Sequence, residues 1–306
     1  MALTLSEASK LSNDMLMRGV VETVIKDSPI LQHMPFIEVM GNSLTYNQEK
    51  TLPGIDFYDV GDTWNESTPT FEQKTATLKI IGGDADVDNF LKATRSNVQD
   101  LEAAIIEMKA KALRHKFEEI FIYGDSEASI KQFDGIRKLI DTESESERVV
   151  AVAASGGELT LDKLDELIDA VKGGKPDMLL MSRRSRRKIN SLVRASGSML
   201  ATDRDSWGNF IQLWDGIPIG VNDWILDTHT VAGGVETATT GGACSAIYAL
   251  QFGEGALCGL SSPGFLQVEP IGQLENKDAS RTRVKWYCSM ALFSSVKAAA
   301  LIGVQD

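Results

Sequence analysis

The stretch NVQDLEAAIIEMKAKALRHKFEEIFIY, from Asn97 to Tyr123, decides the fold. It contains no Gly or Pro, and its apolar residues recur three and four positions apart, which predicts one long helix. At about 1.5 Å per residue this helix would be about 40 Å long, and Gly124 is expected to end it. Two apolar stripes predict that it packs on two sides: Leu101, Ile105, Met108 and Ala112 form one, and Ile106, Leu113, Phe117 and Ile120 form the other.

Before this helix, two predicted strands flank a long loop. The strands are Phe36 to Glu49 and Thr70 to Ile81, the second rich in Thr and Ile. The loop from Thr51 to Pro69 is longer than the roughly 2–5 residues of most hairpin turns. Its tip either folds back on its own domain or meets a partner surface, and no neighbouring segment offers to cover it. We therefore expect its apolar side chains to contact another molecule: Ile55, Phe57, Tyr58 and Trp64.

After the helix, strand and helix patterns alternate, which predicts an α/β or α+β unit. An acidic loop at 141–148 precedes it, and a Gly-, Thr- and Ala-rich loop from Thr228 to Ala243 is expected to be flexible and exposed. The strand from Arg281 to Phe293 alternates apolar and polar residues, so one of its faces is expected to be buried. The remaining expected elements are strands at 148–154, 177–181, 217–221 and 245–252, and helices at 160–172 and from Ser182 onward.

The composition is that of a globular protein with an acidic balance. The 306 residues include 31 Lys and Arg against 43 Asp and Glu, a formal net charge of −12. This argues against a protein whose main role is to grip nucleic acid. Cys244, Cys258 and Cys288 lie far apart, as expected of buried thiols in a reducing compartment. With no signal-peptide pattern and no apolar run near the roughly 20 residues of a membrane helix, we expect a soluble protein made in a cytoplasm.

The densest positive charge is the run Arg183-Arg184-Ser185-Arg186-Arg187-Lys188, at the start of a predicted helix. Such a run can bind nucleic acid, contact an acidic protein surface, or remain a solvated helix face. Because the chain is acidic, its copies repel one another unless cations lie between them. We therefore expect contact with acidic protein surface through Arg183, Arg184, Arg186, Arg187 and Lys188.

Two short motifs suggest ligand sites but depart from the patterns that those sites require. The run Asp84 to Asp88 begins like a calcium loop, but Asn89 and Arg95 stand where a Gly and a bidentate acid are needed. The run Gly253 to Gly259 resembles a dinucleotide-binding loop, but its third Gly comes one place late and Pro263 follows where a helix must begin. We expect a polar strand end at the first and a turn between strands at the second.

No other pattern indicates catalysis or metal binding. His33, His115 and His229 are isolated in the sequence, and no Cys or His pair has the spacing of metal ligands. His115 is expected to be an interior or interface residue. We therefore predict a protein that is not an enzyme and has no cofactor, with a small-molecule enzyme near Gly253 to Gly259 kept as a remote alternative.

The order and spacing of these elements resemble the major capsid proteins of tailed bacteriophages over almost the whole chain. The long loop looks like the extended E-loop hairpin of that family, and the long helix looks like its spine helix. The segment Phe133 to Ile136 resembles the entry into the axial domain, and Gly216 to Ile219 resembles one of its strands. The strand from Arg281 to Phe293, followed by Ala298 to Leu301, resembles the final strand of the peripheral domain.

The resemblance implies an α+β fold in five parts. These are an N-terminal arm (1–34), the extended hairpin (35–87), a peripheral domain with the spine helix (88–130), the axial domain (131–254) and returning strands of the peripheral domain (255–306). A helix around Met15 to Ile25 is expected in the arm, packed either on its own domain or on a neighbour.

The resemblance also implies a structural role. Copies of the chain would form hexamers and pentamers of an icosahedral shell that encloses double-stranded DNA without reading its sequence, in a virion assembled in the host cytoplasm. A portal and a decoration protein would be further partners. Because the arm starts almost at Met1, a separately encoded scaffold, or none, is expected. An encapsulin shell that holds protein cargo is the alternative within the fold.

Some family members cross-link their subunits through a Lys at the hairpin tip. No Lys or Arg lies between Thr51 and Gln73 in this chain, and Lys50 sits at the edge of the loop. We therefore expect subunits that are not covalently linked.

Overall fold

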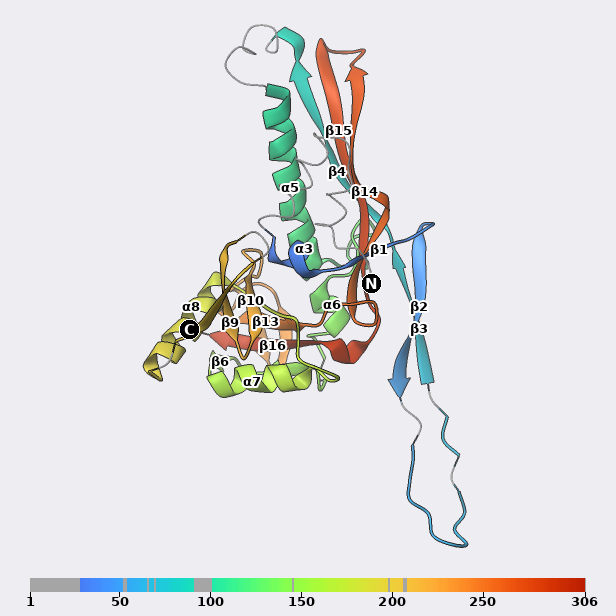
Figure 1. Ribbon diagram of the computed structural model, residues 1–306, viewed down its shortest axis with the longest axis vertical. Coiled ribbons are helices and arrows are strands. Elements are labelled where there is room, and N and C mark those ends of the chain that lie inside the picture. Colours follow the sequence, from blue (N-terminus) through green and yellow to red (C-terminus); the bar gives the residue numbers. More distant parts are fainter. Residues whose placement is uncertain are drawn as a thin grey trace.

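The computed structural model describes residues 28–51, 54–64, 66–68, 70–90, 101–144, 146–197, 199–205 and 208–305. The helix expected around Met15 to Ile25 lies outside these residues. The described chain forms an elongated four-stranded sheet with one long helix, an eight-stranded sheet with two helices against it, and a hairpin that extends away from both (Figure 1).

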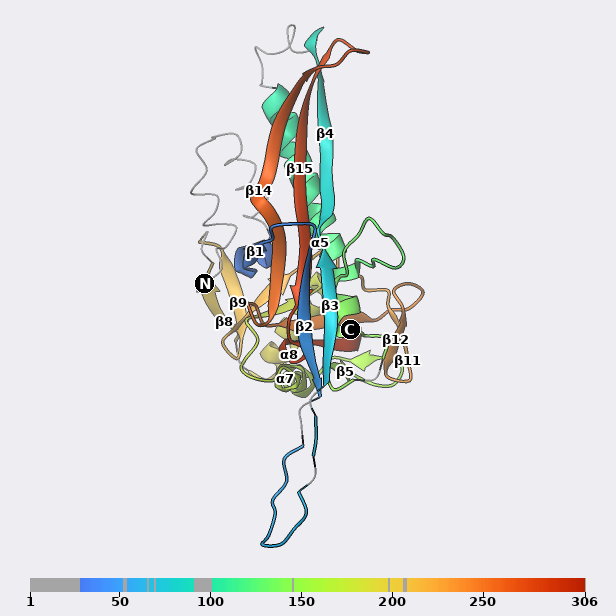
Figure 2. The same cartoon turned by 90° about the vertical axis from the view of Figure 1, so that its right-hand side faces the viewer.

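The four-stranded sheet has the order β1-β14-β15-β4, and helix α5 runs along one of its faces (Figure 2). Three aromatic rings join the two layers: the Phe117 ring centroid lies 4.9 Å from that of Trp286, which lies 5.5 Å from that of Phe36. Alternate residues of β15 face this core, as the sequence predicts, with Val284, Trp286 and Cys288 buried. The elements are β1 (Phe36–Glu38), β4 (Lys79–Asp88), α5 (Leu101–Tyr123), β14 (Leu257–Gln273) and β15 (Ala279–Leu292).

The eight-stranded sheet has the order β5-β16-β13-β7-β10-β9-β8, with β6 also paired to β16. Helices α7 and α8 cover one face through Leu164, Leu167 and Ile189. The elements are β5 (Val149–Ala151), β6 (Gly157–Glu158), α7 (Leu161–Ala170), β7 (Met178–Met181), α8 (Arg183–Ala195), β8 (Ala201–Arg204), β9 (Phe210–Trp214), β10 (Ile217–Val221), β13 (Ser245–Leu250) and β16 (Ala298–Gln305). The strand predicted at 217–221 and the turn predicted after β13 are confirmed.

Two short helices and a small hairpin connect the sheets. Helix α5 ends at Gly124 as predicted, and a Cβ there would lie 2.2 Å from the carbonyl oxygen of Phe133, so only Gly fits. This close approach brings α6 (Ile136–Ile140) back against the end of α5, where Ile136 and Ile140 are buried. The other connecting elements are α3 (Pro29–His33), β11 (Thr230–Ala232), β12 (Val235–Ala238) and the 3-10 turn Ser295–Lys297.

The long hairpin is built from β2 (Ser43–Thr51) and β3 (Thr70–Thr77), which pair antiparallel. The strand expected over 36–49 is in fact two strands, because the chain turns at Gly41, where φ is +126°. The strand expected over 70–81 likewise divides at Leu78 and continues as β4 to Asp88. The hairpin predicted between them is confirmed, and its tip extends beyond the eight-stranded sheet (Figure 1).

Three other predictions need correction. Of the stripe predicted with Leu101 and Ile105, Met108 and Ala112 are exposed in the single chain, Met108 to 61%, and Ile105 is half-buried. The last strand, β16, pairs with β13 in the eight-stranded sheet, so it does not return to the peripheral strands. The loop from Thr228 to Ala243 contains the hairpin β11–β12, with His229 and Glu236 buried.

Candidate assembly interfaces

The hairpin tip presents large apolar side chains to solvent. Ile55 is 91% exposed, Phe57 is fully exposed and Trp64 is 77% exposed. Tyr58 stacks on Trp64, with ring centroids 4.4 Å apart and ring planes 23° apart. Val60, which the sequence analysis did not single out, is also fully exposed. The sequence-predicted residues thus meet at one end of the molecule as an apolar surface that the described part of the chain leaves uncovered.

The acidic residues of the tip shape its turn. The backbone amide of Asp59 donates to the Asp62 carboxylate at 2.7 Å, and the amide of Val60 donates to the Asp59 carboxylate at 2.7 Å. Gly61, with φ of +101°, follows in the left-handed region. Asp59 and Asp62 therefore hold the backbone that displays the aromatic residues.

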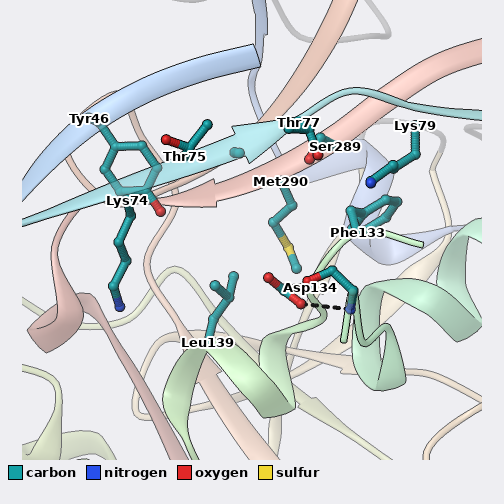
Figure 3. Close-up of a pocket in the computed structure, with 12 residues that line it drawn as sticks. Tyr46, Lys74, Thr75, Thr77, Lys79, Phe133, Asp134, Leu139, Ser289 and Met290 are labelled. Carbon is teal, nitrogen blue, oxygen red and sulfur yellow. Dashed lines mark hydrogen bonds between the residues drawn. The ribbon is translucent and has the colours of Figure 1, made fainter. Parts of the chain in front are cut away.

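The stem of the hairpin is attached to the body of the molecule. The Tyr46 ring packs 4.9 Å from the Phe293 ring, and the buried side chain of Gln48 donates to the carbonyl oxygen of Leu292 at 3.3 Å. Beside this attachment lies a crevice of about 190 Å³ between β3, β15 and the segment after α5 (Figure 3). Lys74 and Asp134 are among its lining residues. The hairpin is therefore anchored at one end and uncovered at the other.

Some basic residues of α8 contact their own subunit, and others are exposed to solvent. Ser182 caps the helix by accepting from the amide of Ser185 at 3.3 Å. Arg184 donates to the carbonyl oxygen of Ala243 of the same chain at 2.7 Å, and Lys188 lies 3.9 Å from the Glu158 carboxylate. The exposed members are Arg183, Arg186 and Arg187, of which Arg183 makes a two-pronged ion pair with Asp223.

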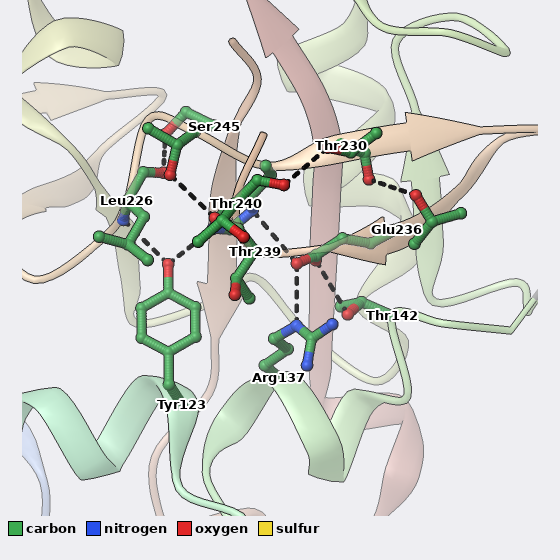
Figure 4. A network of polar contacts seen from close by, with 12 residues as sticks. Tyr123, Arg137, Thr142, Leu226, Thr230, Glu236, Thr239, Thr240 and Ser245 are labelled. Carbon is green, nitrogen blue, oxygen red and sulfur yellow. Dashed lines mark hydrogen bonds and ion pairs between the residues drawn. The ribbon is translucent and has the colours of Figure 1, made fainter. Parts of the chain in front are cut away.

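A buried polar cluster joins the end of α5 to the hairpin β11–β12 (Figure 4). We call it the joint: Tyr123, Arg137, Thr142, His229 and Glu236. The Glu236 carboxylate accepts from Arg137 Nε at 2.8 Å and from Thr142 Oγ1 at 3.1 Å, and His229 Nδ1 lies 3.3 Å from it. His229 Nε2 lies 2.8 Å from the Tyr123 hydroxyl. The same hydroxyl accepts from the amide of Leu226 at 2.9 Å.

The electrostatics of the joint indicate a structural role. Burial lowers the pKa of His229, an effect that outweighs the nearby Glu236 carboxylate, and burial raises the pKa of Tyr123. A neutral imidazole fits the geometry, with Nδ1–H toward Glu236 and Nε2 accepting from Tyr123. The polar groups of the joint bond to one another, so the joint holds α5, α6 and the hairpin β11–β12 together, while Tyr123, Arg137 and Thr142 also line a crevice of about 180 Å³.

A comparison of the sequence with protein-family models shows the family to which the chain belongs. The model described as the phage capsid family matches residues 11–240. The chain belongs to the phage capsid family. It is a major capsid protein with a structural role in the virion. None of the curated proteins compared with it matches.

Solved structures similar to this capsid protein share its fold at low sequence identity. The holo-SrpI encapsulin of Synechococcus elongatus PCC 7942 is 19% identical, with a TM-score of 0.68 over 100% of this chain and 97% of the other. A chain of Mycobacterium phage Bobi is 16% identical, with a TM-score of 0.60 over 100% and 99%. The capsid of a native GTA particle is 14% identical, with a TM-score of 0.61 over 92% and 90%. The α+β capsid fold implied by the sequence resemblance is confirmed.

The two short motifs that resembled ligand sites have structural roles in this capsid protein. Asp84 and Asp86 lie in β4 and form ion pairs with Arg283 and Arg281 of β15, at 2.6 Å each. Among the described residues, no three His, Cys, Asp or Glu side chains cluster as metal ligands. No described helix is long and apolar enough to cross a membrane.

The joint was not predicted from the sequence. His229 is isolated in the sequence but not in space, and Glu236 is the one carboxylate between Thr228 and Ala243. The signal that could have found it is this single charge inside the short alternation Val235 to Ala238. Its partner Arg137 lies 99 positions away, a distance over which no periodicity extends.

Proposed function

We propose that this major capsid protein assembles into hexamers and pentamers of an icosahedral shell that encloses double-stranded DNA. In this proposal the four-stranded sheet with α5 forms the peripheral domain, and the eight-stranded sheet forms the axial domain at the centre of each capsomer. The hairpin tip and the exposed arginines of α8 lie at contacts between subunits.

The observation that carries the proposal is the uncovered tip. Phe57 and Val60 are fully exposed at the end of a hairpin whose stem is anchored by Tyr46 and Gln48. An apolar cluster on a projecting arm gains free energy only when a second surface covers it. Many identical copies supply that surface, and many modest interlocked contacts stabilise a closed shell.

Electron microscopy of the purified protein tests the proposal, because icosahedral particles with capsomers of six and five subunits are directly visible. Nucleic acid extracted from particles produced in a phage infection is expected to be double-stranded DNA. Purified protein that stays monomeric at high concentration, with and without a co-expressed scaffold, would contradict the proposal.

A second candidate function is an encapsulin-type shell around protein cargo. The similarity to the SrpI encapsulin over the full length of both chains favours it. The contents of purified particles separate the two, since protein cargo without DNA supports the encapsulin shell.

We propose further partners for the phage shell: a separately encoded scaffold, a portal, and a decoration protein on the finished capsid, with assembly in the host cytoplasm. The acidic balance of −12 supports a container that does not hold its DNA tightly. Co-purification of precursor particles from infected cells would identify these proteins.

A further inference from the structure

A groove of about 410 Å³ lies between α5 and the start of α8. Arg114 and His115 line it from α5, Arg183 and Arg186 from α8, and Trp224 from the segment after β10. The His115 ring meets the Trp224 ring edge to face, with centroids 5.7 Å apart. The groove therefore combines an aromatic wall with arginines from two separate elements.

The charge in the groove is positive, against the sign of the whole chain. Three arginines face two carboxylates, Glu118 and Asp223, and Asp223 is already bound to Arg183. Burial and the neighbouring Arg114 lower the pKa of His115, so the imidazole adds no charge near pH 7. Arg186 is exposed and forms no ion pair with the residues that the structure describes. In a chain of net charge −12, this concave basic surface favours an acidic ligand.

The shape favours a peptide over duplex DNA. A duplex presents its phosphates on a wide convex surface, which cannot enter a cavity of about 410 Å³. An extended segment or a tight turn can enter it, and its aromatic residues can pack on Trp224 and His115 while carboxylates reach the guanidinium groups. The ligand that fits is a narrow acidic segment that carries aromatic side chains.

The chain itself contains such a segment. The hairpin tip carries Asp56, Asp59, Asp62 and Glu66 among its exposed aromatic residues, and no Lys or Arg lies between Thr51 and Gln73. Asp59 and Asp62 hold the turn, whereas Asp56 is exposed and available. We propose that the groove binds the hairpin tip of a second copy, with Asp56 directed to Arg186. This inference rests on the proposed assembly into capsomers and names the receptor for the tip.

The positions of tip and groove suit a ring. The tip projects at the lower right of Figure 1, whereas α8 lies at the left. Two complementary patches on different sides of one subunit make a head-to-tail contact, which closes into a ring when the rotation between copies permits. The exposed tip and the basic groove then cover each other at every contact of the ring.

Charge exchange tests the contact. Arg186→Glu alone and Asp56→Arg alone are each expected to reduce the yield of particles by roughly tenfold or more, because like charges then face each other. The double variant Arg186→Glu/Asp56→Arg is expected to restore most of the yield. Arg194→Glu is the matched control, since Arg194 is exposed on the same helix but does not line the groove. Circular dichroism establishes that each subunit is folded.

A thiol cross-link tests the geometry independently. All three native cysteines are buried, so Asp56→Cys/Arg186→Cys introduces the only accessible thiols among the described residues. A bismaleimide cross-linker is expected to link neighbouring copies in assembled particles, whereas a direct disulfide would need Cα atoms within about 7 Å, closer than an Asp–Arg ion pair holds them. Asp56→Cys/Lys175→Cys serves as the control, because Lys175 lies at the other end of β7.

The outcomes separate this inference from the assembly proposal. Wild-type protein that forms no shell refutes the assembly proposal. Wild-type shells together with normal yields for Arg186→Glu, or with no link in the double-cysteine variant treated with the bismaleimide, refute the groove as the receptor. An effect of Arg194→Glu as large as that of Arg186→Glu would also overturn it, because α8 would then act through its general charge.

Discussion

The joint and the hairpin tip are opposites: polar side chains are buried in the joint, and apolar side chains are exposed at the tip. In the joint, Glu236 is 1% exposed and is bonded to Arg137 and Thr142 of its own chain. At the tip, Phe57 is fully exposed and the Tyr58 ring stacks on the Trp64 ring. Buried polar groups are costly without partners, so the chain supplies them internally, whereas the apolar tip is left for another molecule. The joint therefore stabilises the subunit, and the tip is expected to stabilise the shell.

Removing the tip is expected to have the largest effect, and on assembly only. Deletion of residues 53–69 should abolish stable shells, while the subunit keeps its stability to within about 1 kcal/mol because Ile55, Phe57 and Trp64 of the tip are exposed. Sizing and circular dichroism of the deletion variant measure both quantities. Particles of normal size and yield would break the contrast between tip and joint.

Breaking the joint is expected to act on the subunit itself. Glu236→Ala leaves Arg137 and His229 without their shared carboxylate, and loss of one partner of a buried ion pair costs about 3–5 kcal/mol. Glu143→Ala is the matched control, because Glu143 binds the same Arg137 at 2.7 Å but is 62% exposed, and an exposed pair contributes about 0–1 kcal/mol. Denaturant unfolding of the two variants measures the difference. Equal destabilisation by both would show that burial of Glu236 does not matter.

The joint also predicts a pH dependence. Burial lowers the pKa of His229 in the folded chain, although Glu236 and Asp227 oppose this and Arg137 adds to it. The unfolded chain binds a proton below about pH 6.5 that the folded chain resists, so stability is fully present above that pH and falls as the pH is lowered, by up to about 1.4 kcal/mol per unit. His229→Gln should flatten the slope of unfolding free energy between pH 5 and 7. An unchanged slope would assign the dependence to other groups.

The sequence predicts the tip and fails to predict the joint for one physical reason. Ile55, Phe57 and Trp64 form a local signal, a run of aromatic and acidic residues without a cation, and the hairpin follows from its two flanking strands. Glu236 becomes buried because Arg137 and Thr142 reach it from 99 and 94 positions away. A Gly-, Thr- and Ala-rich composition is typical of an exposed loop, and only these distant contacts make it a buried hairpin.

The exposed stripe on α5 has a related cause. Helical periodicity correctly identifies the stripes of Ile106 and Met108, but it does not say whether the covering surface belongs to the same chain. Ile106 is 2% exposed under the four-stranded sheet, whereas Met108 is 61% exposed. For the same reason, β16 could be predicted as a strand but not assigned to its sheet, because pairing with β13 is a tertiary contact.

The smallest effect is expected when mature particles are boiled in denaturing detergent, which tests whether the tip is held by covalent bonds. A covalent isopeptide link needs a Lys amine at the contact, and no Lys lies between Thr51 and Gln73. Lys74, the next amine along the chain, lines the crevice at the stem (Figure 3). Mature particles boiled in denaturing detergent should therefore give a single band at the monomer mass of 33.3 kDa.

A ladder of multimers would reveal covalent links, and Lys50→Arg would then be the first variant to examine, since Arg keeps the charge but cannot form the amide. Monomers alone would mean that apolar burial and ion pairs hold the tip, so that shell stability should fall in high salt only to the extent that Asp56 contributes.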